Sequence, residues 1–103
     1  MMFRKLYWVT EAVDSQGHSH VAGVFTSIPE LLRRGLTNIG SGAKLRLTLA
    51  KLDGDTGPFG TWSEPEFSGL GEKLQEFVET DEFSAEHCQM LLESLNQRAR
   101  LAA

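Results

Sequence analysis

The chain has 103 residues, of which 41% are hydrophobic and 23% charged. This is the composition of an ordinary globular protein, and it excludes disordered, collagen-like and coiled-coil chains. The length predicts a single domain over residues 1–103, which can bury about 65% of its surface without a disulfide or a structural metal. Ten basic and 14 acidic residues give a net charge of −4, which argues against nucleic acid as a partner because phosphate contacts need positive charge.

A β-hairpin is expected at the start of the chain. Lys5–Val13 is rich in β-branched and aromatic residues and predicts a strand. Its apolar side chains fall on both faces, as expected for a strand that is covered on two sides or that lies in an oligomer interface. Asp14–Gly17 predicts a turn with a glycine able to adopt a positive φ, and His18–Phe25 predicts the return strand.

A short helix is expected next, over residues 28–34. Ser27 and Glu30 match a capping box, in which the serine hydroxyl accepts a hydrogen bond from the backbone N–H of Glu30. Pro29 falls in the first turn, where its missing N–H donor costs no hydrogen bond. Gly35 is expected to end the helix in the left-handed conformation.

The middle of the chain predicts one long strand and one short strand. Ala43–Leu52 alternates apolar and polar residues, which is typical of a strand with one solvent-facing side. The alternation slips near Ala50, where a β-bulge or the end of the strand would explain it. Asp53–Pro58 is a cluster of turn residues, and Phe59–Ser63 is a candidate edge strand.

Two further helices complete the predicted order. Ser68 or Gly69 begins the first, and Ser84 is a suitable N-cap for the second. Each helix has one apolar face, made of Leu70, Leu74, Phe77 and Val78 in the first and of Cys88, Leu91, Leu92, Leu95, Ala99 and Ala102 in the second. The order β-β-α-β-(β)-α-α predicts an α+β fold, with a small, mostly antiparallel sheet of three to four strands and helices packed on one face.

The charges are distributed unevenly between the two halves of the chain. Residues 1–52 hold seven basic and three acidic residues, a net +4, whereas residues 53–103 hold three basic and 11 acidic residues, a net −8. Either two oppositely charged layers attract each other within the fold, or one of them offers a charged surface to a partner. The candidate anion-binding residues are Arg33, Arg34, Lys44 and Arg46.

A nucleic-acid surface is the most specific form of this second interpretation. If the polar face of the sheet is open, Lys44 and Arg46 together with Trp8 or Tyr7 could bind single-stranded nucleic acid. Alternatively, the two basic side chains pair with the acidic helices or protect an edge strand from aggregation.

The cysteine content and the N-terminal residues predict the compartment. Cys88 is the only cysteine, so no disulfide can form within the chain, which favours a reducing environment. The apolar run in Met1–Val13 is interrupted by Thr10 and Glu11, and it is too short for the core of a signal peptide or for a membrane span. We therefore expect a soluble cytoplasmic protein with no membrane partner.

Two sequence patterns suggest metal sites but do not satisfy metal chemistry. Residues 53–64 resemble an EF-hand calcium loop, but Pro58 occupies the position that needs a glycine. His18 and His20 share one face of a strand, yet a complete site needs a third ligand, and only His87 or Cys88 remains as a nitrogen or sulfur donor. These patterns predict a polar turn and solvent-facing histidines rather than bound metal.

No catalytic pattern is convincing either. Cys88 lies in the first turn of a helix beside His87, but it also begins an apolar stripe and is expected to pack in the core. Glu64 and Glu66 lie on opposite sides of an extended stretch, a poor arrangement for acid–base catalysis. The sequence contains no glycine-rich phosphate loop or nucleophile elbow. We therefore predict no catalytic residue, no metal and no cofactor.

Residues 57–67 are the best place in the sequence for an interaction site. Phe59, Trp62 and Phe67 lie there among glycines and prolines. The three rings either fold back as a lid on the core or are partly exposed and anchor a partner, since tryptophan is favoured at binding hot spots.

The leading functional hypothesis is a non-catalytic protein-interaction or regulatory module, with a homodimer as the expected assembly. It depends on the two apolar faces of the first strand, the stripe of the last helix and the aromatic 57–67 segment. A small-ligand-binding or weakly catalytic domain, with a pocket between sheet and helices, is the first alternative. Nucleic-acid binding through the basic N-terminal half is the second.

Overall fold

The structure of the chain is a computed structural model that describes residues 6–37, 39, 42–51, 59–64 and 67–102. Its first element is the predicted hairpin, in which β1 (Leu6–Val13) pairs antiparallel with β2 (Ser19–Phe25). The carboxylate of Asp14 accepts hydrogen bonds from two backbone N–H groups of the turn, both at 2.9 Å. Gly17 completes the turn at a φ of 85°, a conformation that residues with a Cβ adopt at a steric cost.

The hairpin is part of a four-stranded antiparallel sheet. β3 (Lys44–Lys51) pairs with the other side of β1, and β4 (Gly60–Ser63) pairs with β3. The strand order is β2-β1-β3-β4, so β2 and β4 are edge strands, as expected for the short strand. β3 ends at Lys51 without a bulge. The irregularity lies in β2, where Ala22 is an extra residue without a direct partner on β1.

The predicted short helix forms as two joined segments, α1 (Ile28–Glu30) and the π-helical η1 (Leu31–Gly35). The hydroxyl of Ser27 accepts the backbone N–H of Glu30 at 3.3 Å, which confirms the cap. The widened turn of η1 is closed by a hydrogen bond of 3.2 Å from the N–H of Leu36 to the carbonyl of Leu31.

Gly35 does not adopt the left-handed conformation that the sequence predicted. The glycines with positive φ in the described part of the chain are Gly17, Gly42 and Gly69. Gly35 is instead required by close packing, because a Cβ there would lie 2.7 Å from the side chain of Leu31 and 2.8 Å from the ring of Phe25. The glycine therefore lets η1 approach the end of β2, a tertiary contact that a local sequence signal does not show.

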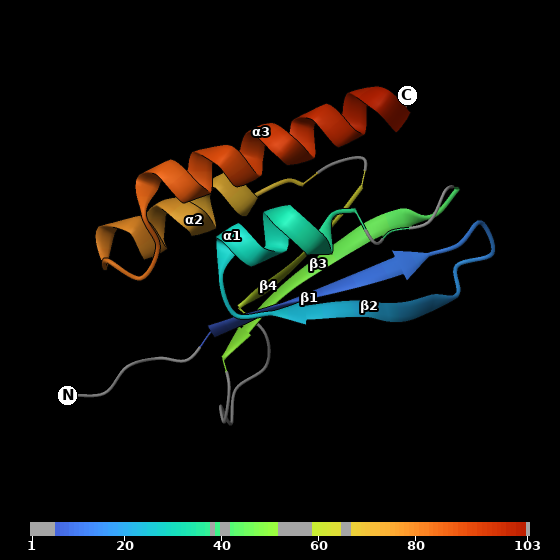
Figure 1. Cartoon of the computed structure of the whole chain (residues 1–103), viewed down its shortest axis with the longest axis horizontal. Coiled ribbons are helices and arrows are strands. Elements are labelled where there is room, and N and C mark those ends of the chain that lie inside the picture. Colours follow the sequence, from blue (N-terminus) through green and yellow to red (C-terminus); the bar gives the residue numbers. More distant parts are fainter. Residues whose placement is uncertain (1–5, 38, 40–41, 52–58, 65–66, 103) are drawn as a thin grey trace.

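The two remaining helices are α2 (Leu70–Glu79) and α3 (Ala85–Ala102). α2 begins after Gly69, whose φ is 82° and which supplies no side-chain cap. α3 begins after Ser84, whose hydroxyl accepts the backbone N–H of His87 at 3.1 Å. Figure 1 shows all the helices on one side of the sheet, which confirms the α+β fold and its predicted layering.

The core fills the space between the sheet and the helix layer. The centre of the core is formed by fully buried residues on one face of the sheet, namely Trp8, Thr10, Leu45, Leu47 and Leu49. The helices supply Leu31, Leu70, Leu74, Leu91 and Leu95, which are no more than 1% exposed. No helix in the described residues is long and apolar enough to cross a membrane.

Candidate functional site

The face of the sheet that points away from the helices has no covering element in the described part of the chain (Figure 1). We call this surface the open face. The alternation along each strand and the strand register assign its members, which are Ser19, Val21 and Val24 on β2, Tyr7, Val9, Glu11 and Val13 on β1, Lys44, Arg46, Thr48 and Ala50 on β3, and Thr61 and Ser63 on β4.

The half of the open face formed by β1 and β2 is mostly apolar. Val21 and Val24 are 59% and 58% exposed, and they are two of the three large hydrophobic side chains that are exposed among the described residues. Tyr7, Val9 and Val13 are half-buried beside them. The two apolar faces that the sequence shows on the first strand are therefore real, but helices cover only one of them.

The other half of the open face is polar, and an ion pair lies where the two halves meet. Arg46 donates hydrogen bonds to both carboxylate oxygens of Glu11, at 3.1 and 2.9 Å, and one to the hydroxyl of Ser19 at 2.9 Å. The guanidinium of Arg46 holds the pKa of the Glu11 carboxyl below its ordinary value. The hydroxyls of Thr48 and Thr61 lie 3.1 Å apart on the adjacent strands.

The two edges of the sheet are poor templates for another strand. β2 carries the bulge at Ala22, which interrupts its regular spacing of hydrogen-bonding groups. β4 has only four residues. A partner strand would therefore find few regular backbone partners at either edge, whereas the open face is continuous.

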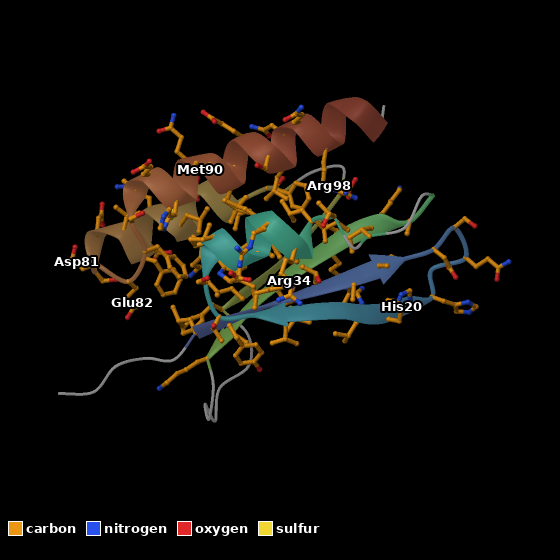
Figure 2. The ribbon with its side chains drawn as sticks, viewed as in Figure 1. His20, Arg34, Asp81, Glu82, Met90 and Arg98 are labelled. Carbon is orange, nitrogen blue, oxygen red and sulfur yellow. The ribbon has the colours of Figure 1, made fainter. Side chains whose placement is uncertain are left out.

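A groove of about 440 Å³ lies between α3 and the joined segments α1 and η1, mainly against η1. Pro29, Leu32 and Met90 provide apolar atoms, while Arg33, Glu86 and His87 provide polar ones. Met90 is 46% exposed and lies on the helix layer, away from the open face (Figure 2). This groove lies between helices and not between the sheet and the helices, where the sequence-based alternative placed a pocket. A smaller hollow of about 240 Å³ lies beside Phe59 and Phe77.

The three aromatic residues predicted to form an interaction surface pack against the core. Trp62 points inward from β4, opposite Leu47, and is 8% exposed. Phe59 and Phe67 are partly buried against the core, and the ring of Phe59 meets that of Phe77 edge-on at 5.3 Å. This arrangement fits the alternative of a lid on the core and offers no exposed tryptophan.

The four predicted anion-binding residues fall on two different surfaces. Arg33 and Arg34 lie on η1 in the helix layer, where both contact the carboxylate of Glu30. Lys44 and Arg46 lie on the open face, and Arg46 is held by its own ion pair. The structure therefore does not bring the four together, and three of them already have an acidic partner.

The aromatic residues proposed for nucleic-acid stacking also separate. Trp8 is fully buried on the covered face, where its ring stacks on that of Phe83 at 5.7 Å. Tyr7 is half-buried on the open face. Of these two rings, that of Tyr7 therefore lies on the same face of the sheet as Lys44 and Arg46, and that of Trp8 does not.

The ion pairs also bear on the charge asymmetry. Arg46 pairs with Glu11 inside the basic half of the chain, whereas Arg98 pairs with Glu64 and Lys73 with Glu76 inside the acidic half. Each of these contacts lies within one half of the chain, so these three pairs do not join the basic half to the acidic half.

The candidate metal and nucleophile residues are dispersed. His18 lies in the turn, with its Nδ1 3.6 Å from Asp14, and His20 is exposed on β2 (Figure 2). Cys88 is 5% exposed, and burial raises the pKa of its thiol, which keeps it protonated. The described residues contain no group of three potential ligands that could hold a metal ion. The EF-hand-like positions 53–58 and Glu66 lie outside the described residues.

Sequence reasoning missed the role of Glu64. Its Oε1 accepts the backbone N–H of Leu45 at 2.8 Å and two hydrogen bonds from Arg98, at 3.0 and 2.6 Å. Arg98 also donates to the carbonyl of Leu36 at 3.2 Å and lies between α3 and the sheet (Figure 2). The pair links α3 to β3, to the residue after β4 and to the end of the first helix. No local motif relates two residues 34 positions apart.

Comparison with known proteins adds no relative, because no family model, curated protein or solved structure matches the chain.

Proposed function

We propose that the protein is a non-catalytic, cytoplasmic interaction module that self-associates through the open face. The observation that carries this proposal is the apolar half of that face, where Val21 and Val24 are more than half exposed. An exposed apolar patch on a sheet is a common mark of an interaction site. A second copy of the chain is the occupant that offers a matching apolar patch, since both copies carry the same one.

The size of the open face supports a weak and reversible dimer. Four strands spaced about 4.8 Å apart, with about seven residues on average at 3.3 Å per residue, cover roughly 450 Å². Two such faces together bury about 900 Å², somewhat below the roughly 1,200 Å² at which stable interfaces begin. We therefore expect dissociation constants in the micromolar range or weaker.

The chemistry of the remaining residues gives less support to an enzyme. The thiol of Cys88 is buried and its pKa is raised. The carboxylate of Glu64 is engaged by Arg98. Neither group has the accessible partner that nucleophilic or acid–base catalysis requires.

Sedimentation velocity from low to high micromolar concentration tests the proposal. We expect the wild-type protein to shift from monomer to dimer as its concentration rises. Val24→Lys should weaken the dimer by about 30-fold or more, because in a symmetric interface each substitution removes apolar burial twice and adds two ammonium groups.

Met90→Lys is the matched control. Met90 is also an exposed apolar residue, at 46%, but it lies on α3 rather than on the open face. This variant should therefore dimerise like the wild type. A wild-type chain that stays monomeric at every concentration would overturn the proposal, as would equal weakening by the two lysine substitutions.

Binding of a small ligand in the groove between η1 and α3 is a second candidate function. Its volume of about 440 Å³ is within the usual range of ligand sites. The half-buried imidazole of His87 has no hydrogen-bond partner within the described residues. A thermal-shift screen with small amphiphilic acids should then raise the melting temperature of the wild type but not of Met90→Glu, because the added carboxylate repels an acid from the groove. No shift with any compound would count against this candidate.

A further inference from the structure

We propose that the two copies pack face to face about a two-fold axis that runs across the strands, along the row Val24, Val9, Thr48 and Thr61. This geometry rests on the proposed self-association and specifies how the second copy is placed on the open face.

The row is defined by the strand register. Val9 on β1 lies directly opposite Val24 on β2 and opposite Thr48 on β3, and Thr48 lies opposite Thr61 on β4. Directly opposed residues share a face of the sheet. The four side chains therefore form one straight line across the open face, apolar at the β2 end and hydroxyl-bearing at the β4 end.

A two-fold axis along this line sets each member of the row against its own copy. Valine then meets valine at one end, and threonine hydroxyls meet threonine hydroxyls at the other. An apolar group gains by being covered with another apolar group, while a hydroxyl needs a hydrogen-bonding partner when it is buried. The axis satisfies both conditions at the same time.

The same axis exchanges the rows on either side of it. Glu11 and Arg46 lie two residues beyond the row in one direction, and Tyr7 and Ala50 lie two residues beyond it in the other. The ion pair of each copy is therefore placed on Tyr7 and Ala50 of the second copy. Because Arg46 already neutralises Glu11 through two hydrogen bonds, no free charge of this pair enters the interface. The ring of Tyr7 can also receive the guanidinium plane.

An axis parallel to the strands and centred on β1 gives a poorer match. With the axis along β1, strand β2 of one copy would lie on strand β3 of the other. The exposed side chains of Val21 and Val24 would then face Arg46 and Thr48, so apolar groups would cover a polar half. Pairing between edge strands is disfavoured by the bulge at Ala22 and by the short β4.

Three variants that each add one cysteine to the chain test this geometry with a short bismaleimide. Packed sheets are separated by about 10 Å, which such a reagent spans. Val9→Cys and Thr61→Cys place a thiol on the proposed axis, one near its centre and one at an exposed end. Val21→Cys places the thiol off the axis. The two thiols of the dimer would then be about 13 Å apart along the strands, in addition to their separation across the interface. Wild type is the reagent control, because Cys88 is buried.

We expect crosslinked dimers from the variants at positions 9 and 61, and little product from the variant at position 21. Adding Val24→Lys to Thr61→Cys should remove the product. Crosslinking at 9 but not at 61 would overturn the proposal in favour of an axis along β1, since residues 61 would then be about 19 Å apart across the strands. Crosslinking at 21 alone would indicate edge pairing.

The result also separates this geometry from the proposed function. If sedimentation shows a dimer that Val24→Lys weakens, but neither position 9 nor position 61 crosslinks, the geometry is wrong and self-association through the face stands. If sedimentation shows only monomer, both are wrong. Thr61 is exposed, so Thr61→Cys is informative even if Val9→Cys destabilises the fold.

Discussion

Two neighbouring residues of β3 show how differently the two faces of the sheet are used. Leu47 points toward the helices and is fully buried, whereas Thr48 points to the open face and is half-buried. On β1, however, both faces are largely apolar, because Tyr7, Val9 and Val13 alternate with Leu6, Trp8 and Ala12. The covered face therefore explains the composition of β3, while the apolar residues on the open side of β1 have no covering element in a single copy.

The largest expected effect tests this contrast directly. Leu47→Ala should lower the free energy of unfolding by about 3 kcal/mol or more, because it opens a cavity in the covered face. Thr48→Ala should cost less than about 1 kcal/mol, since it removes only a cross-strand hydroxyl contact with Thr61.

Urea denaturation at low protein concentration measures the two costs on the monomer, because dimerisation would add stability of its own. Similar costs for the two substitutions would contradict the contrast. They would mean that the open face is packed as tightly as the covered one within a single copy.

The next effect concerns the pair that ties the helix layer to the covered face. Arg98→Met leaves the Glu64 carboxylate, whose side chain is 5% exposed, without its cation. We expect a loss of about 2–4 kcal/mol, slightly below the usual cost of breaking a buried pair because Arg98 is itself 25% exposed. Arg33→Met is the control, since that exposed pair with Glu30 contributes about 0.5 kcal/mol or less.

A second substitution distinguishes charge from packing at this site. Glu64→Gln added to Arg98→Met should recover part of the loss in urea denaturation, because the neutral amide can still accept the N–H of Leu45. No recovery would indicate that Arg98 stabilises the protein through its contacts rather than by matching the buried charge.

Alanine substitutions at two glycines of the helix layer are expected to change the stability of the protein in opposite directions. Gly35→Ala should destabilise the protein by about 1–3 kcal/mol, because the new methyl group would lie under 3 Å from Phe25 and Leu31. Gly71→Ala, inside α2, meets only Leu92 at 3.9 Å and should stabilise by up to about 1 kcal/mol through helix propensity. Thermal unfolding of both variants measures the signs. A neutral Gly35→Ala would show that η1 does not depend on close approach to β2.

These sites also show which features of the structure could be predicted from the sequence. The hairpin turn at Asp14 and the caps at Ser27 and Ser84 are local signals, in which a side chain bonds to backbone a few residues away, and they were read correctly. The α+β layering followed from the order of the elements. Local signals could not predict Gly35 or the Glu64–Arg98 pair, because both are determined by contacts between distant segments.

The candidate site was only half predicted. The two apolar faces of β1 could be read from the alternation, but which face the helices cover depends on the register with β2 and β3. Trp62 lies in a segment rich in turn residues that gives no clear alternation, so its inward direction could not be inferred. The sequence therefore favoured the aromatic segment as the interaction surface, whereas the structure exposes valines on β2 instead.

The smallest expected effect lies on the open face itself. Arg46 lowers the pKa of Glu11 in the folded protein, so the ionised carboxylate stabilises the fold above the pKa of the unfolded chain. This contribution is lost as the pH falls through the lowered folded pKa.

Glu11→Gln lacks this contribution. Its deficit in free energy of unfolding should be constant above about pH 5 and should shrink as the pH falls below the ordinary glutamate pKa of about 4.3. We expect it to stay below about 1 kcal/mol, because the pair is partly exposed and screened by solvent. Urea titrations of both proteins between neutral and acidic pH measure it. A deficit that grows toward acidic pH would contradict the sign. If the open face is the interface, acid should also weaken the wild-type dimer, because protonation of Glu11 leaves Arg46 as an unpaired cation against Tyr7 and Ala50 of the second copy.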